Sequence, residues 1–119
     1  MELRNKKRAI SVEIALMYNL KSLAGKVVTI KSHKGDEIVA RLMGFNEEGT
    51  VLTIHHPKIV VISGDSVVLI PFALTAKCDE VFLHTNQIFA VLETSEVTAE
   101  EYLDLVKEEL GDEDDADPA

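Results

Sequence analysis

Residues 40–54 read ARLMGFNEEGTVLTI, two apolar runs separated by a short polar turn. Ala40 and Leu42 occupy alternate positions of the first run, and Leu52 and Ile54 occupy alternate positions of the second. Apolar residues at every second position are typical of strands with one buried face. The glycine in the turn takes positive φ without steric penalty. The stretch therefore predicts two antiparallel strands joined by a tight turn.

The same period of two continues on both sides of this stretch. Upstream, two β-branched runs flank HKGD at residues 33–36, which predicts a hairpin. Downstream, residues 58–74 form two apolar arms around SGDS at residues 63–66, and residues 80–93 supply the last short strands. We therefore predict a mainly β fold, in which a helix precedes five strands in a meander and a second helix follows. Such strands form a small, strongly bent antiparallel sheet or barrel.

The N-terminal part of the chain predicts a basic arm followed by a helix. Residues 1–10 hold a cluster of cations, and a run of like charge is usually solvated or in contact with phosphates. Residues 11–24 place apolar side chains at steps of four and three, which is typical of a helix. Ser11 suits the N-cap position, and Gly25 suits the position just after the last turn.

The C-terminal part predicts a helix and a tail. Thr98 and Glu101 have the spacing of a capping box, in which each side chain satisfies a free backbone N–H of the first turn. We expect an amphipathic helix over residues 96–111 that is closed by Gly111, and a disordered acidic tail over residues 112–119.

The charge of the chain is unevenly distributed. The formal net charge is −9, yet residues 96–119 contain eleven acidic residues and one lysine. Residues 1–95 carry ten acidic and eleven basic residues, so the body is almost neutral. The overall acidity therefore does not exclude a polyanionic partner for the body, although it does not favour one.

Several function classes are not expected for this chain. Cys78 is the single cysteine, so a disulfide within the chain and a thiolate metal site are excluded. His55 and His56 are adjacent on a predicted strand and point to opposite faces, so no metal site is expected. No phosphate-binding glycine loop or nucleophile motif occurs, and we expect neither an enzyme nor a cofactor. No apolar run is long enough to span a membrane, and we expect a cytoplasmic protein.

Two spaced motifs lie at turns of the predicted strands. In the first, Gly35 separates two apolar strands, the second of which leads to Gly44-Phe45-Asn46, with Thr50 four residues after Asn46. The second motif is Leu83-His84-Thr85-Asn86-Gln87-Ile88. With these motifs, residues 11–93 resemble the Sm-like (LSm/Hfq-type) family, and the chain is similar to a divergent phage-encoded or other prokaryotic member. The apolar strand positions that fit the family pattern are Val28, Ile30, Ile38, Ala40 and Leu42.

The resemblance implies a nucleotide pocket, but several pocket positions differ. In the family, a base stacks between an aromatic residue and an arginine, and an asparagine reads the edge of the base. Here Asn46 and Thr50 stand at the family's Asp and Asn positions, Glu48 at the aromatic position, and His84-Thr85 at the Arg-Gly position. Stacking requires a ring face or a guanidinium plane, and Glu48 offers neither. The candidate RNA-binding residues are Asn46, Thr50, His84, Thr85 and Asn86.

The resemblance also implies a ring of about five to seven identical subunits, a number that head-to-tail contacts with cyclic closure allow. Sm-like rings pair the fourth strand of one subunit with the fifth strand of the next. The candidate interface residues on the corresponding strands are Val67, Leu69, Phe72, Leu74, Ile88, Phe89 and Val91.

Two functions remain open for this ring. The first is a non-catalytic ring that binds single-stranded RNA through the degenerate pocket. The alternative is a structural or protein-interaction ring that has lost RNA binding, with other proteins bound by the hairpin of residues 58–75 or by the acidic tail. The predicted organisation is an arm (1–10), an Sm-like domain (11–95), a helix (96–111) and a tail (112–119).

Overall fold

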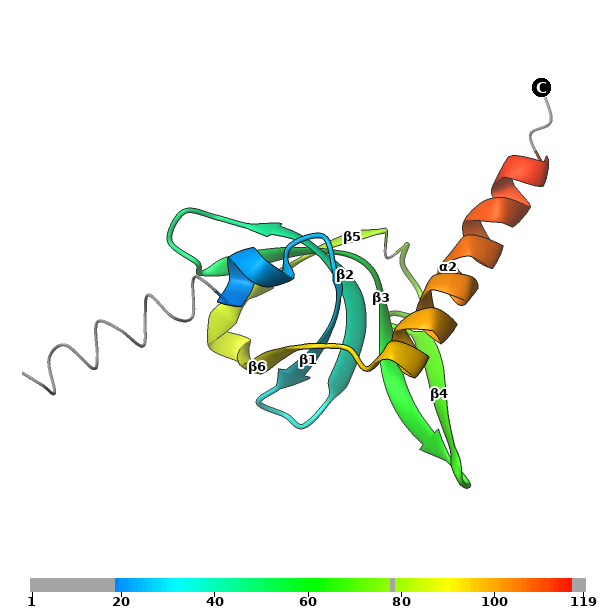
Figure 1. Cartoon of the computed structure of the whole chain (residues 1–119), viewed down its shortest axis with the longest axis horizontal. Coiled ribbons are helices and arrows are strands. Elements are labelled where there is room, and N and C mark those ends of the chain that lie inside the picture. Colours follow the sequence, from blue (N-terminus) through cyan, green and yellow to red (C-terminus); the bar gives the residue numbers. More distant parts are fainter. Residues whose placement is uncertain (1–18, 78, 117–119) are drawn as a thin grey trace, which may run out of the picture.

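The computed structural model describes residues 19–77 and 79–116, which form a bent sheet with a helix at each end of the chain (Figure 1). Residues 19–23 are the described part of the N-terminal helix, so its predicted cap, Ser11, and the basic arm lie outside the described residues. The elements that follow are β1 (Val27–Ser32), β2 (Glu37–Phe45), β3 (Val51–Ser63), β4 (Ser66–Pro71), β5 (Glu80–His84), the 3-10 turn η1 (Thr85–Gln87), β6 (Ile88–Glu93) and α2 (Glu96–Ala116).

The predicted hairpins are confirmed. β1 pairs with β2 antiparallel, with Ile30 opposite Ile38, and β3 pairs with β4 antiparallel, with Ser63 opposite Ser66. The turn between β2 and β3 closes at Gly49, whose φ of 69° lies in the left-handed region that favours glycine. The mainly β fold class with a helix on each side is therefore confirmed.

The sheet has six strands in place of the predicted five, because two short strands, β4 and β5, share the position beside β3. β3 is 13 residues long and pairs on one side with β2 and on the other with both β4 and β5. β4 ends at Pro71, opposite Lys58, and β5 begins at Glu80, opposite His55. The two strands thus follow the same edge of β3, and the chain leaves the ladder between Pro71 and Glu80.

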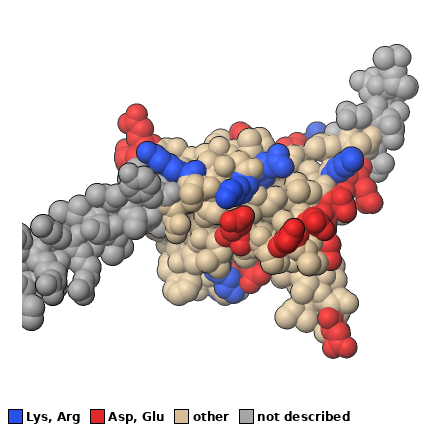
Figure 2. All heavy atoms as spheres, in the orientation of Figure 1, with Lys and Arg blue, Asp and Glu red and all other residues tan. Residues whose placement is uncertain are grey.

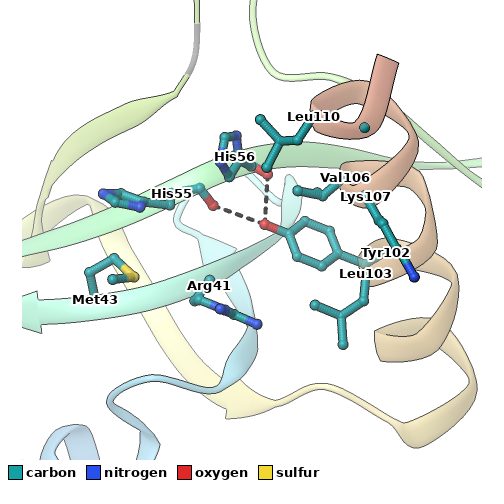
Figure 3. A pocket seen from close by; sticks show the side chains of 10 residues that line it. Arg41, Met43, His55, His56, Tyr102, Leu103, Val106, Lys107 and Leu110 are labelled. Carbon is teal, nitrogen blue, oxygen red and sulfur yellow. Dashed lines mark hydrogen bonds between the residues drawn. The ribbon is translucent and has the colours of Figure 1, made fainter. Parts of the chain in front are cut away.

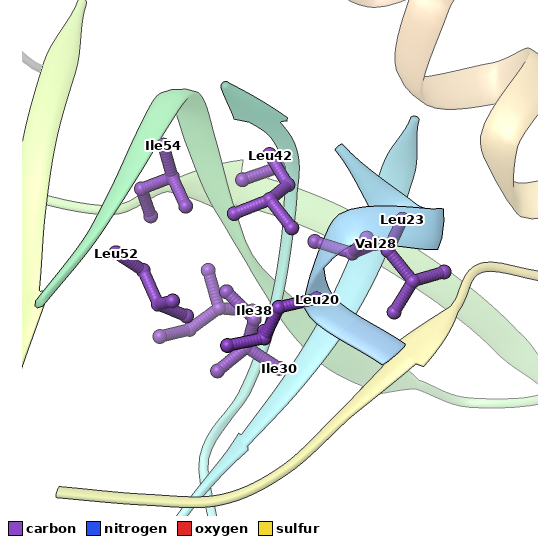
Figure 4. Packing of buried hydrophobic residues seen from close by; sticks show 9 residues of the cluster. Leu20, Leu23, Val28, Ile30, Ile38, Leu42, Leu52 and Ile54 are labelled. Carbon is purple, nitrogen blue, oxygen red and sulfur yellow. The ribbon is translucent and has the colours of Figure 1, made fainter. Parts of the chain in front are cut away.

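The inner face of the sheet holds the main core, which consists of aliphatic side chains (Figure 4). Nine buried residues form it: Leu20, Leu23, Val28, Ile30, Ile38, Ala40, Leu42, Leu52 and Ile54. Leu20 and Leu23 come from the helical turn before β1, so this turn covers the inner face as its apolar spacing predicts. Ala40, Leu42, Leu52 and Ile54 confirm the alternation from which the hairpin was predicted.

The outer face of the sheet is covered by α2. Tyr102 is 1% exposed and packs with Val27 and Val39, and the half-buried Val60, Leu69, Ala99 and Val106 surround them. Val27 and its neighbour Val28 are both buried, which shows that β1 is covered on both faces.

The predicted start of the C-terminal helix at residue 96 agrees with the structure, but its predicted N-cap and its predicted end were wrong. α2 begins at Glu96, and the Ser95 carbonyl accepts the N–H of Ala99 at 2.8 Å, so Thr98 lies inside the first turn and is not the N-cap. The helix also continues through Gly111 to Ala116, so residues 112–116 are helical and not a disordered tail. A glycine inside a helix is disfavoured by only about 1 kcal/mol, which continued helical hydrogen bonding offsets.

Candidate functional site

The structure brings the two motif turns together at one end of the sheet. Val51, which follows the β2–β3 turn, lies opposite His84 at the end of β5. The Thr85 N–H donates a hydrogen bond to the Thr50 carbonyl at 2.9 Å. The two segments that the sequence assigned to one pocket are therefore neighbours in space, and the register of β3 with β5 is what places them there.

Within this site, Asn46 and Thr50 bond to each other. The Asn46 Nδ2 donates to Thr50 Oγ1 at 2.8 Å, and the Asn46 Oδ1 accepts the N–H groups of Thr50 at 2.8 Å and Val51 at 3.0 Å. An asparagine that bonds the backbone of its own turn is a common turn-stabilising arrangement. The Asn46 side chain thus holds the turn, and its amide oxygen already has two donors.

The second half of the site is formed by His84, Thr85 and Asn86. His84 is exposed at the end of β5, Thr85 is half-buried in η1, and Asn86 is exposed. Glu47 and Glu48 are exposed in the facing turn, where carboxylates repel phosphate. The described site therefore offers one imidazole face and a few polar groups beside two negative charges.

The predicted interface residues separate into two groups. Phe72, Ile88 and Val91 are half-buried against the inner core, and Leu69 is half-buried beneath α2. Val67, Leu74 and Phe89 are 51%, 89% and 72% exposed. The first group helps to build the fold of its own chain, because these side chains pack against its two buried clusters.

The strand order leaves two edges of the sheet without a partner among the described residues. The order β4-β3-β2-β1-β6, with β5 also on β3, places β4 and β5 at one edge and β6 at the other. Phe82 on β5 is 62% exposed, and Phe89 on β6 is 72% exposed. Phe82 was not predicted as an interface residue, although its alternation with the inward Val81 and Leu83 is the signal that identifies it.

A groove between α2 and the sheet is a second candidate site that the sequence did not predict (Figure 3). It has a volume of about 530 Å³, and Arg41 and Met43 from β2, His55 and His56 from β3, and Leu110 from α2 are among its lining residues. The helical stripe of Tyr102, Val106 and Leu110 was visible in the sequence, but nothing there identified the sheet face that it covers.

Tyr102 forms one wall of this groove and fixes the helix to β3. Its hydroxyl lies 2.9 Å from the carbonyl oxygens of both His55 and His56, to which it donates its hydrogen (Figure 3). Burial raises the pKa of Tyr102 to about 12, because the phenolate would lose its hydration in this position. The tyrosine is therefore a neutral donor at physiological pH.

β3 is kinked at the point where Tyr102 holds it. His56 has a φ of 50°, which is unusual for a residue other than glycine, and the buried Pro57 follows it. The His56 N–H donates to the Asp79 carbonyl at 3.0 Å, and His55 Nε2 lies 2.9 Å from Glu80 Oε2. These contacts join the kink to the start of β5.

Two further findings concern residues 19–77 and 79–116. No three histidine, cysteine, aspartate or glutamate side chains among those described, in residues 19–77 and 79–111, lie close enough to hold a metal ion. No helix in this part of the chain has the length and apolar character needed to cross a membrane.

Comparison with known proteins gives similarity in fold. No family model and no curated protein sequence matches the chain. Among solved structures, the SmAP1 heptamer of P. aerophilum is similar over 67% of this chain and 93% of that chain, with 15% identity and a TM-score of 0.49. A heptameric archaeal Sm protein is similar over 66% of this chain and 98% of that chain, with 14% identity and a TM-score of 0.48.

A third solved structure is that of an Sm-like protein, AF-Sm2, from Archaeoglobus fulgidus. It is similar over 63% of this chain and 88% of that chain, with 17% identity and a TM-score of 0.45. These similar structures are archaeal Sm-like proteins, from the family whose motifs the sequence resembles. The phage-encoded or other prokaryotic origin stays a prediction.

Proposed function

We propose that this chain is the subunit of a closed, non-catalytic ring of identical copies. The proposal is supported by two apolar edges, which lie at the two ends of the sheet. The edge made by β4 and β5 exposes Val67 and Phe82, and the edge made by β6 exposes Phe89 and Leu92.

Unpaired edges of this kind favour pairing with another chain. The two edges differ, so β6 of one copy pairs with the β4 and β5 edge of its neighbour. The pair of copies then still has one free edge of each kind, to which further copies can add. Such a head-to-tail contact forms a ring when the rotation between copies closes. The strong bend of the sheet favours a closed arrangement over an open filament.

The mass of the native particle tests the ring. We expect light scattering to give about five to seven times the 13.1 kDa mass of one chain. Phe89→Lys places a charge on the β6 edge and should reduce the particle to a monomer, because edge charges oppose strand pairing.

Ile62→Lys is the matched control for this variant. Ile62 is 75% exposed, as Phe89 is, but it lies beside the tip of the β3–β4 hairpin and opposite Val67 within the chain. The ring should survive this change. A monomeric wild type, or a ring that persists in Phe89→Lys, would refute the proposed assembly.

Contact with single-stranded RNA is a second candidate function of the ring. The hydrogen bond from Thr85 to Thr50 supports it, because it joins the two segments that the Sm-like resemblance assigns to one pocket. The exposed His84 is the described group of this site that offers a ring face for stacking. Repetition of a weak site around a ring raises the total affinity.

RNA binding is tested by fluorescence anisotropy with short U-rich, A-rich and mixed RNAs at two salt concentrations. His84→Ala should weaken binding about tenfold if one stacking contact is lost. His55→Ala is the matched control, because the His55 side chain pairs with Glu80 at the start of β5, whereas His84 stands at its other end beside the β2–β3 turn. A ring that binds none of these RNAs would favour the alternative, a structural or protein-interaction ring.

A further inference from the structure

A second, shallower groove lies between β4 and α2, on the outer side of the sheet. It has a volume of about 390 Å³. The strand contributes Val67, Val68 and Leu69, of which Val67 and Val68 are 51% and 39% exposed. The helix contributes Glu101, Asp104 and Glu108 to the opposite wall. The groove therefore combines an apolar floor with a negatively charged wall.

Among the described residues, Glu101, Asp104 and Glu108 form no ion pair. The ion pair that α2 forms there joins Glu109 to Lys58. Acidic side chains are also visible along α2 in Figure 2. A groove of this composition suits a segment that carries cations followed by apolar residues, because the charges complement each other and the apolar side chains cover the strand.

The chain itself contains such a segment outside the described residues. Residues 1–10 carry four cations and one acid, and residues 10–16 alternate apolar side chains with others as ISVEIAL. About twelve residues separate Lys7 from Asn19, which corresponds to about 40 Å of extended chain and to about 18 Å if all of them are helical. The segment thus has both the composition and the reach for a groove on a neighbouring copy.

The proposed ring brings the segment to the edge that borders the groove. Leu20 and Leu23 belong to the inner core, to which Ile88 and Val91 of β6 also contribute, so the N-terminal segment leaves the fold on the inner side of the sheet. If β6 of one copy pairs with the β4 and β5 edge of its neighbour, the segment has to pass this edge to reach the groove on the outer side.

We infer that the N-terminal segment of each copy, residues 1–17, docks into the groove between β4 and α2 of the neighbouring copy and straps the two subunits together. This inference rests on the proposed ring. The cations of the arm face Glu101, Asp104 and Glu108, and the apolar residues after them cover Val67 and Val68. The strap adds a charge-dependent contact to the strand pairing.

Disulfide trapping between two chains tests the strap. One full-length chain carries Ile10→Cys, the other carries Leu105→Cys at the floor of the groove, and both carry Cys78→Ser. The mixed chains should form an interchain disulfide at low salt. Reversal of the arm charges to glutamate, or of the three groove carboxylates to lysine, should slow its formation about tenfold, since three exposed ion pairs are lost. The rate should be restored when the Ile10→Cys chain carries the arm reversal and the Leu105→Cys chain carries the groove reversal.

The matched control is Glu47→Lys with Glu48→Lys, which changes charge at the remote β2–β3 turn and should leave the rate unchanged. If circular dichroism shows that the variant with all three groove carboxylates changed to lysine is unfolded, the single change Asp104→Lys is used in its place. Equal rates in all charge variants would overturn the strap. A double-cysteine chain that traps only an intrachain disulfide would overturn the assignment to the neighbour.

The native mass of the same samples separates this inference from the proposed function. A ring mass without charge-dependent trapping would remove the strap and leave the ring in place. A monomeric mass would overturn the ring and the strap together.

Discussion

The inner face of the sheet and the helical turn before it bury nine aliphatic side chains against one another, whereas the outer face buries Val27 and Val39 beneath Tyr102 of α2. The inner cluster draws on three strands and the helical turn before them, so each residue supports several elements. The outer cluster depends on Tyr102, whose ring packs on Val27 and Val39 while its hydroxyl bonds the kink of β3. This difference suggests that the inner face determines whether the chain folds, and the outer face determines whether α2 stays docked.

The largest expected effect comes from truncation in the inner face. Ile54 is fully buried on β3, and Ile54→Ala should lower the free energy of unfolding by about 3–4 kcal/mol through lost burial and a residual cavity. Urea unfolding at fixed protein concentration measures it, and the fixed concentration matters because assembly contributes to apparent stability. Ile62→Ala on an exposed position is the control. A loss below 1 kcal/mol in Ile54→Ala would contradict the role given to the inner face.

The next effect is a loss of stability at high pH. The pKa of Tyr102 is about 12 in the fold against 10.0 for a free tyrosine. Below pH 10 both states are protonated and the contribution is complete. As pH rises from 10 towards 12, the unfolded chain loses the proton first, so the stability of the fold falls, by about 2–3 kcal/mol in total.

This pH effect is isolated by comparison with Tyr102→Phe, which cannot titrate at this position. Urea midpoints between pH 9 and pH 12 should fall more steeply in the wild type than in the variant. Parallel curves for the two proteins would show that Tyr102 ionises as freely in the fold as in the unfolded chain.

A smaller effect is expected from the hydroxyl itself at neutral pH. Tyr102→Phe keeps the ring against Val27 and Val39 but removes the donor to His55 and His56, which should lower stability by about 1–2 kcal/mol. Proteolysis within α2 should then accelerate more than hydrogen exchange in β1 and β2. Equal changes in both regions would mean that the two faces unfold as one unit.

The smallest effect concerns the ion pair between α2 and β3. Lys58 Nζ lies 2.6 Å from Glu109 Oε1, with the lysine side chain 12% exposed and the glutamate 49% exposed. Glu109→Gln should lower stability by about 0.5–1 kcal/mol, and added salt should reduce the difference. Glu100→Gln, a matched change on α2 outside this pair, is the control. A Glu109→Gln effect no larger than that of the control would show that the ion pair contributes nothing.

The strand region was predictable because its signals are local. Alternation at residues 40–54 identified the inward side chains, and the turn residues identified the hairpins, so the hairpin in which Ile30 pairs with Ile38 was predicted from sequence alone. The convergence of Thr50 with Thr85 was predicted only through the Sm-like resemblance, since no local pattern indicates that these turns meet.

The ends of α2 were less predictable because tertiary contacts decide them. The β-ladder ends near Thr94, whose N–H bonds to the Val27 carbonyl, and the chain turns into the helix directly after it. Packing of Tyr102 on Val27 and Val39 then fixes the phase of the helix, whatever the capping box at Thr98 favours. The groove beneath α2 follows from this docking and has no signature in the sequence.

The division of one sheet edge into β4 and β5 has a practical consequence for engineering. The chain leaves the edge of β3 after Pro71 and rejoins it at Glu80, opposite the two residues His56 and Pro57, so the ladder on either side does not depend on the length of this excursion. Closure of a longer loop adds only about 0.6 kcal/mol for each doubling of its length. The excursion is therefore an insertion point at which a reporter or an affinity peptide extends the chain while both halves of the edge keep their register.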